Sequence, residues 1–141
     1  MAIDRVAPAR ERLVDVRASA VFCTGDSVLV VLALDRAWGA GLALRTPFPG
    51  HASRTLTVGP ALGADGSAVI ALRAVGDSVR SALVLSSGRM TLAAGRGASG
   101  SFAAALPPRD SGSGPQRFAG AFRDLPTTDS AAACGAGTRT P

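Results

Sequence analysis

The sequence predicts an all-β domain, a single antiparallel β-sandwich or partly open barrel of about eight to nine short strands. Two observations support this prediction. Turn-forming residues interrupt the chain about every ten residues, a spacing that is typical of sandwiches and barrels. Polar helix formers are scarce, because the 141 residues include no Lys, one Glu and one Gln beside 17 Gly and 9 Pro. An exposed helical face needs such residues, so long amphipathic helices are not expected.

One core is expected for a chain of this length, with an extension at each end. Residues 1–12 contain five charged side chains and one proline and precede the first expected strand, so we expect an extended N-terminal arm. Residues 13–126 form the predicted β-domain. Residues 127–141 are poor in bulky side chains, which predicts a loosely ordered tail.

The first expected strand covers residues 14–22, where apolar residues occupy every second position. A Gly-Asp-Ser turn follows, and then the apolar run of residues 27–34. Because this run is apolar on both faces, it is interpreted as a central strand buried on both sides. The segments GDSVLVVLAL (25–34) and GDSVRSALVL (76–85) resemble each other. We interpret this as two hairpins that need the same turn chemistry, with internal duplication as the alternative.

The middle of the chain alternates short strands with turns. Residues 35–41 read as a Gly-rich interruption and residues 47–51 as a loop. Asp65-Gly66 favours a type I′ hairpin turn. The expected strands cover residues 42–46, 54–58, 68–75, 80–85 and 89–94. For the fourth of these, a helix over residues 78–85 capped by Asp77 is the alternative.

The last hairpin has the clearest pattern. Phe102, Ala104 and Leu106 share one face of the first arm, and Phe118 and Phe122 share one face of the second. The segment between the arms, PPRDSGSGP, has the composition of a loop. Alternation places these phenylalanines in the core and the neighbouring arginines on the surface.

The basic charge of +5 is carried by 15 arginines that are spread along the chain. This distribution is typical of a solvated surface. The densest group lies near the N-terminus, so the candidate contacts to a protein partner or an acidic surface include Arg5, Arg10 and Arg12. Trp38, in the Gly-rich segment, and Phe48, between two prolines, are candidates of the hot-spot type. Packing against the core is the alternative for both aromatic residues.

Residue types that carry catalysis are few, so the chain is predicted not to be an enzyme. His51 is the single histidine, and no nucleophile-elbow motif accompanies it. The segment GRGASG (95–100) matches a dinucleotide-binding pattern, but a short alternating segment and two prolines follow it instead of a helix. No cofactor or metal site is expected. A small hydrolase that uses His51 with a serine is the alternative function, and a basic nucleic-acid-binding domain is another.

The two cysteines, Cys23 and Cys134, lie too far apart for a redox or zinc motif. In an oxidising compartment they form a candidate disulfide between the first strand and the tail. Two unrelated thiols are the alternative.

These observations favour a non-catalytic structural or binding module. We expect an accessory subunit of a larger protein assembly, extrinsic to a membrane or envelope complex, with nucleic acid the less favoured partner. No segment is long and apolar enough for a spanning helix, and the N-terminus lacks the apolar region of a secretory signal. The cell envelope or the periplasmic side is the favoured location, with an export segment already removed. The cytoplasm is the alternative.

Overall fold

The structure is a computed structural model of the chain. It describes residues 1–23, 27–35, 37–45, 53–63, 67–74, 83–94, 97–107 and 114–129. These residues form strands and turns and contain no helix, so none is long and apolar enough to cross a membrane. The prediction of an all-β fold is confirmed.

Twelve strands occur in the described residues, more than the eight or nine expected. They are β1 (Ala2–Ala7), β2 (Glu11–Asp15), β3 (Ser19–Cys23), β4 (Val28–Leu34), β5 (Trp38–Arg45), β6 (Arg54–Val58), β7 (Ser67–Ala74), β8 (Leu83–Val84), β9 (Ser87–Ala93), β10 (Ala98–Leu106), β11 (Gln116–Leu125) and β12 (Thr127–Asp129).

All twelve strands belong to one sheet, in the order β12-β3-β4-β5-β7-β6-β9-β10-β11-β1-β2, with β8 paired to β7. The sheet curls strongly into an open half-barrel, so the partly open barrel describes it better than the sandwich of separate sheets. Two pairings are parallel, β6 with β7 and β12 with β3, and the others are antiparallel. The β6–β7 pairing spans two residue pairs and joins the two halves of the sheet.

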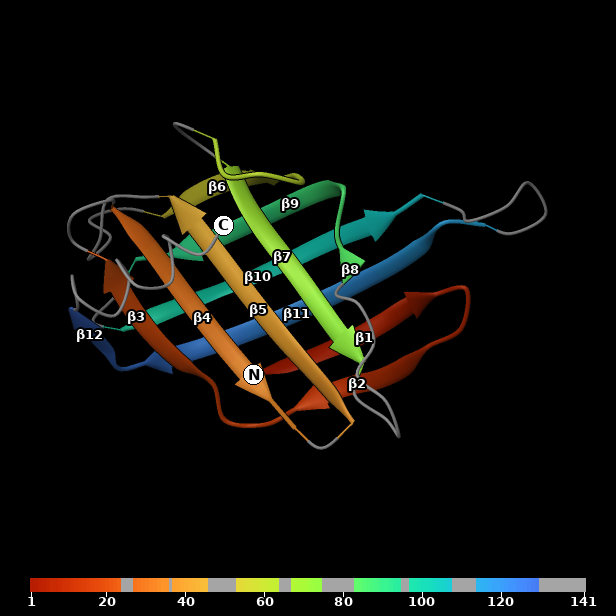
Figure 1. Cartoon of the computed structure of the whole chain (residues 1–141), viewed down its shortest axis with the longest axis horizontal. Coiled ribbons are helices and arrows are strands. Elements are labelled where there is room, and N and C mark those ends of the chain that lie inside the picture. The colour runs from red at the N-terminus through yellow and green to blue at the C-terminus, as the bar shows by residue number, and fades with distance from the viewer. Residues whose placement is uncertain are drawn as a thin grey trace.

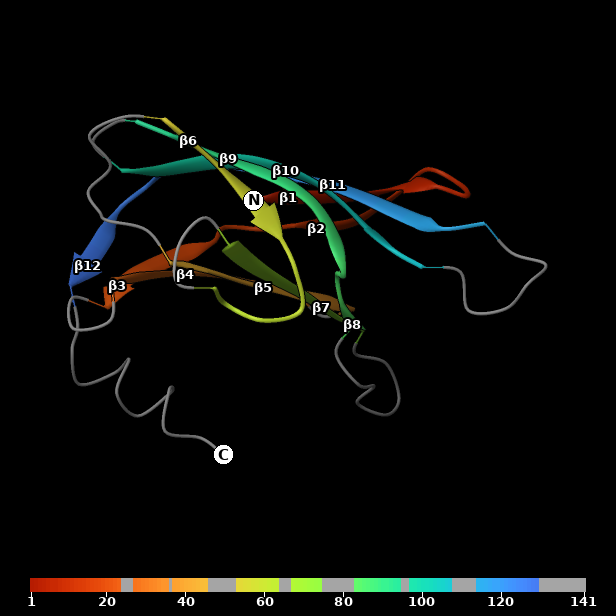
Figure 2. The same cartoon turned by 90° about the horizontal axis from the view of Figure 1, so that it is seen from above.

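We call β12, β3, β4, β5, β7 and β8 the aliphatic half, and β6, β9, β10, β11, β1 and β2 the polar half. In Figure 1 the aliphatic half lies in front, and its strands cross those of the polar half behind it. Figure 2 shows the two halves facing each other from above. The inward residues of both halves form one hydrophobic cluster, which includes Leu29, Leu42 and Ile70 from the aliphatic half and Ile3, Met90 and Phe118 from the polar half.

The expected N-terminal arm is instead a strand in the interior of the sheet. β1 pairs with β11 on one side and with β2 on the other. Ile3 is fully buried, which explains why this charged segment is held in place. Of the expected tail, residues 127–129 form the edge strand β12 beside β3, and residues 130–141 lie outside the described residues.

The alternating segment of residues 14–22 is divided between two strands. Val14 belongs to β2, in the polar half, and Ala20 and Phe22 belong to β3, in the aliphatic half. Val14, Ala18, Ala20 and Phe22 are all buried, as the alternation predicted. The pattern persists through the corner because the chain keeps its apolar side toward the same core as it passes from one half to the other.

The central strands of the polar half agree with the predicted hairpin. β10 and β11 pair in a register that places Phe102 opposite Gly120 and Gly100 opposite Phe122. A side chain on Gly120 would collide with the ring of Phe102, whose Cζ lies 2.6 Å from the position that its Cβ would take. Each glycine therefore leaves room for a phenylalanine ring from the neighbouring strand.

The two copies of the GDSV phrase fall mostly outside the described residues, so their turn conformations stay a prediction. The strand after the first copy is β4, which lies between β3 and β5. After the second copy, Leu83 and Val84 form the short strand β8 and the N–H of Leu85 donates to the carbonyl of Ile70, so these residues are not helical. Residues 78–82 of the alternative helix lie outside the described residues.

Candidate interaction surface

β4 was predicted to be buried on both sides. Its inward side is buried, whereas its outward side changes from buried at Val28 through half-buried at Val30 to exposed at Leu32 and Leu34. Leu29, Val31 and Ala33 point into the core and are at most 1 % exposed. Leu32 and Leu34 point outward and are 48 % and 68 % exposed. The strand lies inside the sheet, between β3 and β5, but no segment that the structure describes covers these two leucines. The prediction that the second face is buried was therefore wrong at Leu32 and Leu34.

The neighbouring strands continue this apolar surface. Residues that pair in register share a face of the sheet, so the outward row that contains Leu32 runs through Gly41, Ala71 and Val84. The next row runs through Val21, Val30, Ala43 and Val69. We call these outward residues the aliphatic face: Val21, Val30, Leu32, Leu34, Gly41, Ala43, Val69, Ala71 and Val84.

The aliphatic face is exposed to differing extents. Val84 is 39 % exposed, and Val21, Val30 and Val69 are half-buried. Charged residues lie at its ends: Arg45 closes β5, and Arg73 lies near the end of the antiparallel neighbour β7. A continuous apolar surface of this kind is typical of an interaction site on a soluble domain.

The outer surface of the polar half carries ion pairs instead. Arg12 on β2 donates to the carboxylate of Asp4 on β1, with Nε 2.8 Å from Oδ1, and lies 3.4 Å from Asp15. Arg5 pairs with Glu11 across the same two strands. The hydrogen bond from Arg12 lowers the pKa of Asp4, and the same bond raises the pKa of Arg12.

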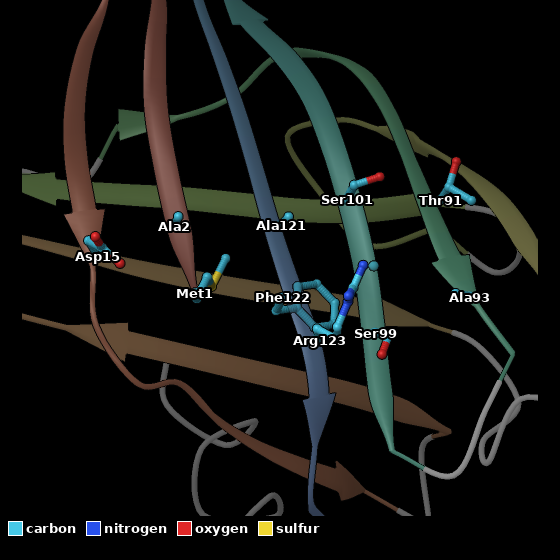
Figure 3. A pocket seen from close by; sticks show the side chains of 11 residues that line it. Met1, Ala2, Asp15, Thr91, Ala93, Ser99, Ser101, Ala121, Phe122 and Arg123 are labelled. Carbon is cyan, nitrogen blue, oxygen red and sulfur yellow. The ribbon is translucent and has the colours of Figure 1, made fainter.

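A depression of about 540 Å³ also lies on the polar half (Figure 3). Thr91, Ser101, Ala121, Ala2 and Asp15 follow one another in register across five strands along it. Arg123 and Ser99 lie at one end. The lining combines the hydroxyl groups of Thr91, Ser99 and Ser101 with the side chains of Asp15 and Arg123, so the depression offers polar contacts.

The predicted partner-binding arginines cluster on the β1–β2 hairpin. Arg5 and Arg12 are engaged in the ion pairs described above, and Arg10 is exposed in the connection between the strands. Their role in binding stays a prediction. Opposite charges three to eight residues apart in MAIDRVAPARERLVD are the signal that could have indicated this pairing.

Trp38 is the first residue of β5, not part of a loop, and it packs partly buried against the core. The carboxylate of Asp35 accepts the backbone N–H groups of Ala37, at 2.9 Å, and of Trp38. This turn explains how β5 begins earlier than the sequence indicated. Phe48 lies outside the described residues, so its predicted role was not tested.

The predicted core role of the phenylalanines is confirmed. Phe102, Phe118 and Phe122 are at most 4 % exposed and so do not offer a stacking surface to nucleic acid.

His51 lies outside the described residues, and the hydrolase alternative stays a prediction. Gly97 and Ala98 of the glycine-rich motif lead into the strand β10. In the part of the chain that the structure describes, no three potential metal ligands lie together.

Cys23 ends β3 and is 2 % exposed. Its candidate partner, Cys134, lies outside the described residues, so no disulfide joins two described residues and the bridge stays a prediction. β12 ends beside Phe22, since Asp129 is its register partner, and Cys134 follows five residues later. Intact mass measured with and without reductant tests the bridge.

Sequence reasoning missed Leu32 and Leu34 as functional candidates. The signal was present in the uninterrupted apolar run VLVVLAL, which was interpreted as a fully buried strand. A run that is apolar on both faces indicates that neither face is suited to contact with water. It does not show whether the second face is covered by the same chain.

Protein-family models, curated protein sequences and solved structures were compared with the chain, and none of them matches it significantly.

Proposed function

We propose that the chain is a non-catalytic structural or binding module that docks into a larger protein assembly as an accessory subunit. The observation that supports this function is the aliphatic face, in which Leu32 and Leu34 are 48 % and 68 % exposed. Burying such side chains is favourable by about 25 cal/mol per Å² of apolar surface, and this gain drives most protein association.

The contrast between the two outer surfaces gives the docked module an orientation. The aliphatic face turns toward the assembly, and the polar half, with its ion pairs between Arg12, Asp4 and Asp15, turns toward water. The periphery of a membrane or envelope complex is the setting that we propose, because a module there needs one docking side and one wetted side.

The test is the size of the native complex in gentle extracts of the source cells. We expect the wild-type chain to migrate in a species larger than the free chain, and Leu34→Asp to shift it to the size of the free chain. Leu34 is exposed, so this change leaves the core intact. Val6→Asp is the control, because Val6 is an exposed valine on the polar half, and it should leave the complex intact.

Wild-type chain that migrates at the size of the free chain would contradict the proposed function. Equal loss of the complex in the Leu34→Asp and Val6→Asp variants would show that the aliphatic face is not the docking surface.

A further inference from the structure

A pocket of about 610 Å³ lies at one corner of the fold, where two segments of the chain pass from the polar half to the aliphatic half. The first segment runs from β2 into β3, and the second runs from β11 into β12. They lie side by side because β12 pairs with β3 (Figure 1). We call this hollow the corner pocket, and the polar residues that line it are Arg17, Ser19, Arg123, Asp124 and Thr128.

We propose that the corner pocket binds a phosphate ester of a polyol, such as a sugar phosphate, and that Arg17 and Arg123 hold the phosphate. The volume of the pocket lies within the range of about 300–1,000 Å³ that is typical of small-ligand sites. This inference goes beyond the proposed function, because it does not depend on what the aliphatic face binds.

The first argument is the state of the two arginines. Among the described residues, Arg5 and Arg12 pair with carboxylates, whereas Arg17 and Arg123 take part in no ion pair. Both are exposed, and both line the corner pocket. A guanidinium group without a carboxylate partner keeps its N–H donors for a ligand, so the pocket offers two sets of donors for an anion.

The second argument is the β-bulge that places Arg123 and Asp124. The register between β10 and β11 shifts between Ala98 and Gly100, so Ser99 alone faces both residues. Asp124 has a positive φ of 52°, and its N–H donates to Oγ of Ser99 at 2.8 Å. Neighbouring side chains of a regular strand point to opposite faces, whereas Arg123 and Asp124 both line the corner pocket. Bulges that re-aim side chains in this way are common beside active sites.

The third argument is the match between these groups and a phosphate with a polyol attached. One bidentate guanidinium occupies both oxygens of a carboxylate, whereas a phosphate monoester has three terminal oxygens and accepts from two guanidinium groups. The carboxylate of Asp124 only accepts hydrogen bonds, so it repels a second anion and favours hydroxyl groups. Ser19 and Thr128 add hydroxyls that both donate and accept.

The experiment is isothermal titration calorimetry of the purified full chain with glucose 6-phosphate as the probe. We expect a dissociation constant below about 1 mM at low salt and weaker binding as salt rises. Three comparison probes each lack part of the proposed chemistry: inorganic phosphate has no polyol, glucose has no charge, and glucuronate carries a carboxylate instead of a phosphate. Each should bind more weakly, on the order of 10-fold.

Arg17→Gln and Arg123→Gln should each weaken the binding of glucose 6-phosphate on the order of 10-fold or more, because each removes charge-assisted hydrogen bonds. Both arginines are exposed, so these changes leave the core intact. Arg117→Gln is the matched control and should leave binding unchanged. Arg117 is also an exposed arginine of β11 and takes part in none of the ion pairs described above, but it lies outside the corner pocket.

A further variant, Asp124→Gly, separates the two parts of the ligand. Glycine adopts a positive φ readily, so the bulge should be retained. Loss of the carboxylate removes its repulsion of an anion, and inorganic phosphate should bind more tightly. It also removes an acceptor for hydroxyl groups, so the advantage of glucose 6-phosphate over inorganic phosphate should shrink.

Flotation with phosphatidylcholine vesicles that contain phosphatidylinositol 4-phosphate identifies the source of the ligand, because this headgroup presents a phosphate monoester on a polyol. Flotation that is abolished by Arg17→Gln and by competing glucose 6-phosphate would support a lipid headgroup. Binding of glucose 6-phosphate without flotation would support a soluble ligand. Both results agree with a polyol phosphate in the corner pocket.

Three outcomes would overturn this inference: no binding of glucose 6-phosphate up to about 10 mM, a loss in Arg117→Gln equal to that in Arg17→Gln, or glucuronate that binds as tightly as glucose 6-phosphate. The proposed function would fail by a different result, namely a chain that migrates alone in native extracts, and that result would leave the corner pocket unaffected.

Discussion

On β4 of the aliphatic half the outward residues are Val28, Val30, Leu32 and Leu34, whereas β11 of the polar half presents Arg117, Ala119, Ala121 and Arg123 outward. Both strands direct aliphatic or aromatic residues into the same core. The alternation on β11 is what a sheet needs when one face meets water, and β4 lacks it. The core therefore does not account for the outward leucines, whereas the docking partner proposed above would.

The largest expected change in the free energy of unfolding comes from replacing leucines on the two sides of β4. Leu29 is fully buried, so Leu29→Ala should lower the free energy of unfolding by about 2–5 kcal/mol. Leu34→Ala, on the exposed side, should change it by less than about 0.5 kcal/mol in the purified chain. Urea unfolding of the two purified variants and of the wild-type chain measures both changes.

Similar losses for Leu29→Ala and Leu34→Ala would show that Leu34 is covered within the single chain. The aliphatic face would then be part of the core, and the distinction between the two halves would disappear.

A smaller change in the free energy of unfolding is expected when one glycine from each half is replaced by alanine. The Cβ of Gly120→Ala would lie 2.6 Å from Cζ of Phe102 and 3.0 Å from Cγ1 of Ile3, inside the packed core. Overpacking of this kind should lower the free energy of unfolding by about 1–3 kcal/mol. The Cβ of Gly41→Ala would meet only Cδ2 of Leu32, at 3.6 Å, which is ordinary contact.

Gly41→Ala should therefore be neutral or stabilise the chain by up to about 1 kcal/mol, because it restricts the unfolded chain without a collision. Thermal unfolding of the two variants side by side measures the difference. If Gly41→Ala were as costly as Gly120→Ala, the outward side of β5 would be as closely packed as the core.

The sequence was sufficient to predict the β10–β11 hairpin, because its alternation and its loop composition are both local. The division between β2 and β3 could not be predicted, since Val14, Ala18 and Ala20 keep their alternation through the corner. The β6–β7 pairing, which makes one sheet of two halves, depends on contacts distant in sequence. Nor could the exposure of Leu32 be predicted, because burial by the chain and burial by a partner leave the same apolar pattern.

The smallest expected effect concerns the ion pairs on the outer strands of the polar half. Arg12 lowers the pKa of Asp4 below its ordinary value of 3.8, chiefly through their hydrogen bond. The carboxylate thus stays charged to lower pH in the folded chain than in the unfolded chain. Its contribution to stability is complete above the unfolded pKa, and it is lost as the pH falls from about 4 through the lowered folded value.

Asp4→Asn should therefore cost a little stability at pH 7 and nothing at a pH below the folded pKa, so that its unfolding curve and that of wild type converge in acid. The loss should be smaller than those of Leu29→Ala and Gly120→Ala, because exposed ion pairs contribute little. Asp35→Asn, at the turn before β5, is the contrasting change, because its carboxylate accepts the backbone N–H groups of Ala37 and Trp38 and takes part in none of the ion pairs described above. If the free energies of unfolding of Asp4→Asn and wild type differed by the same amount at every pH down to acid, the pair with Arg12 would not stabilise the fold. The polar half would then differ from the aliphatic face only in having polar side chains in contact with water.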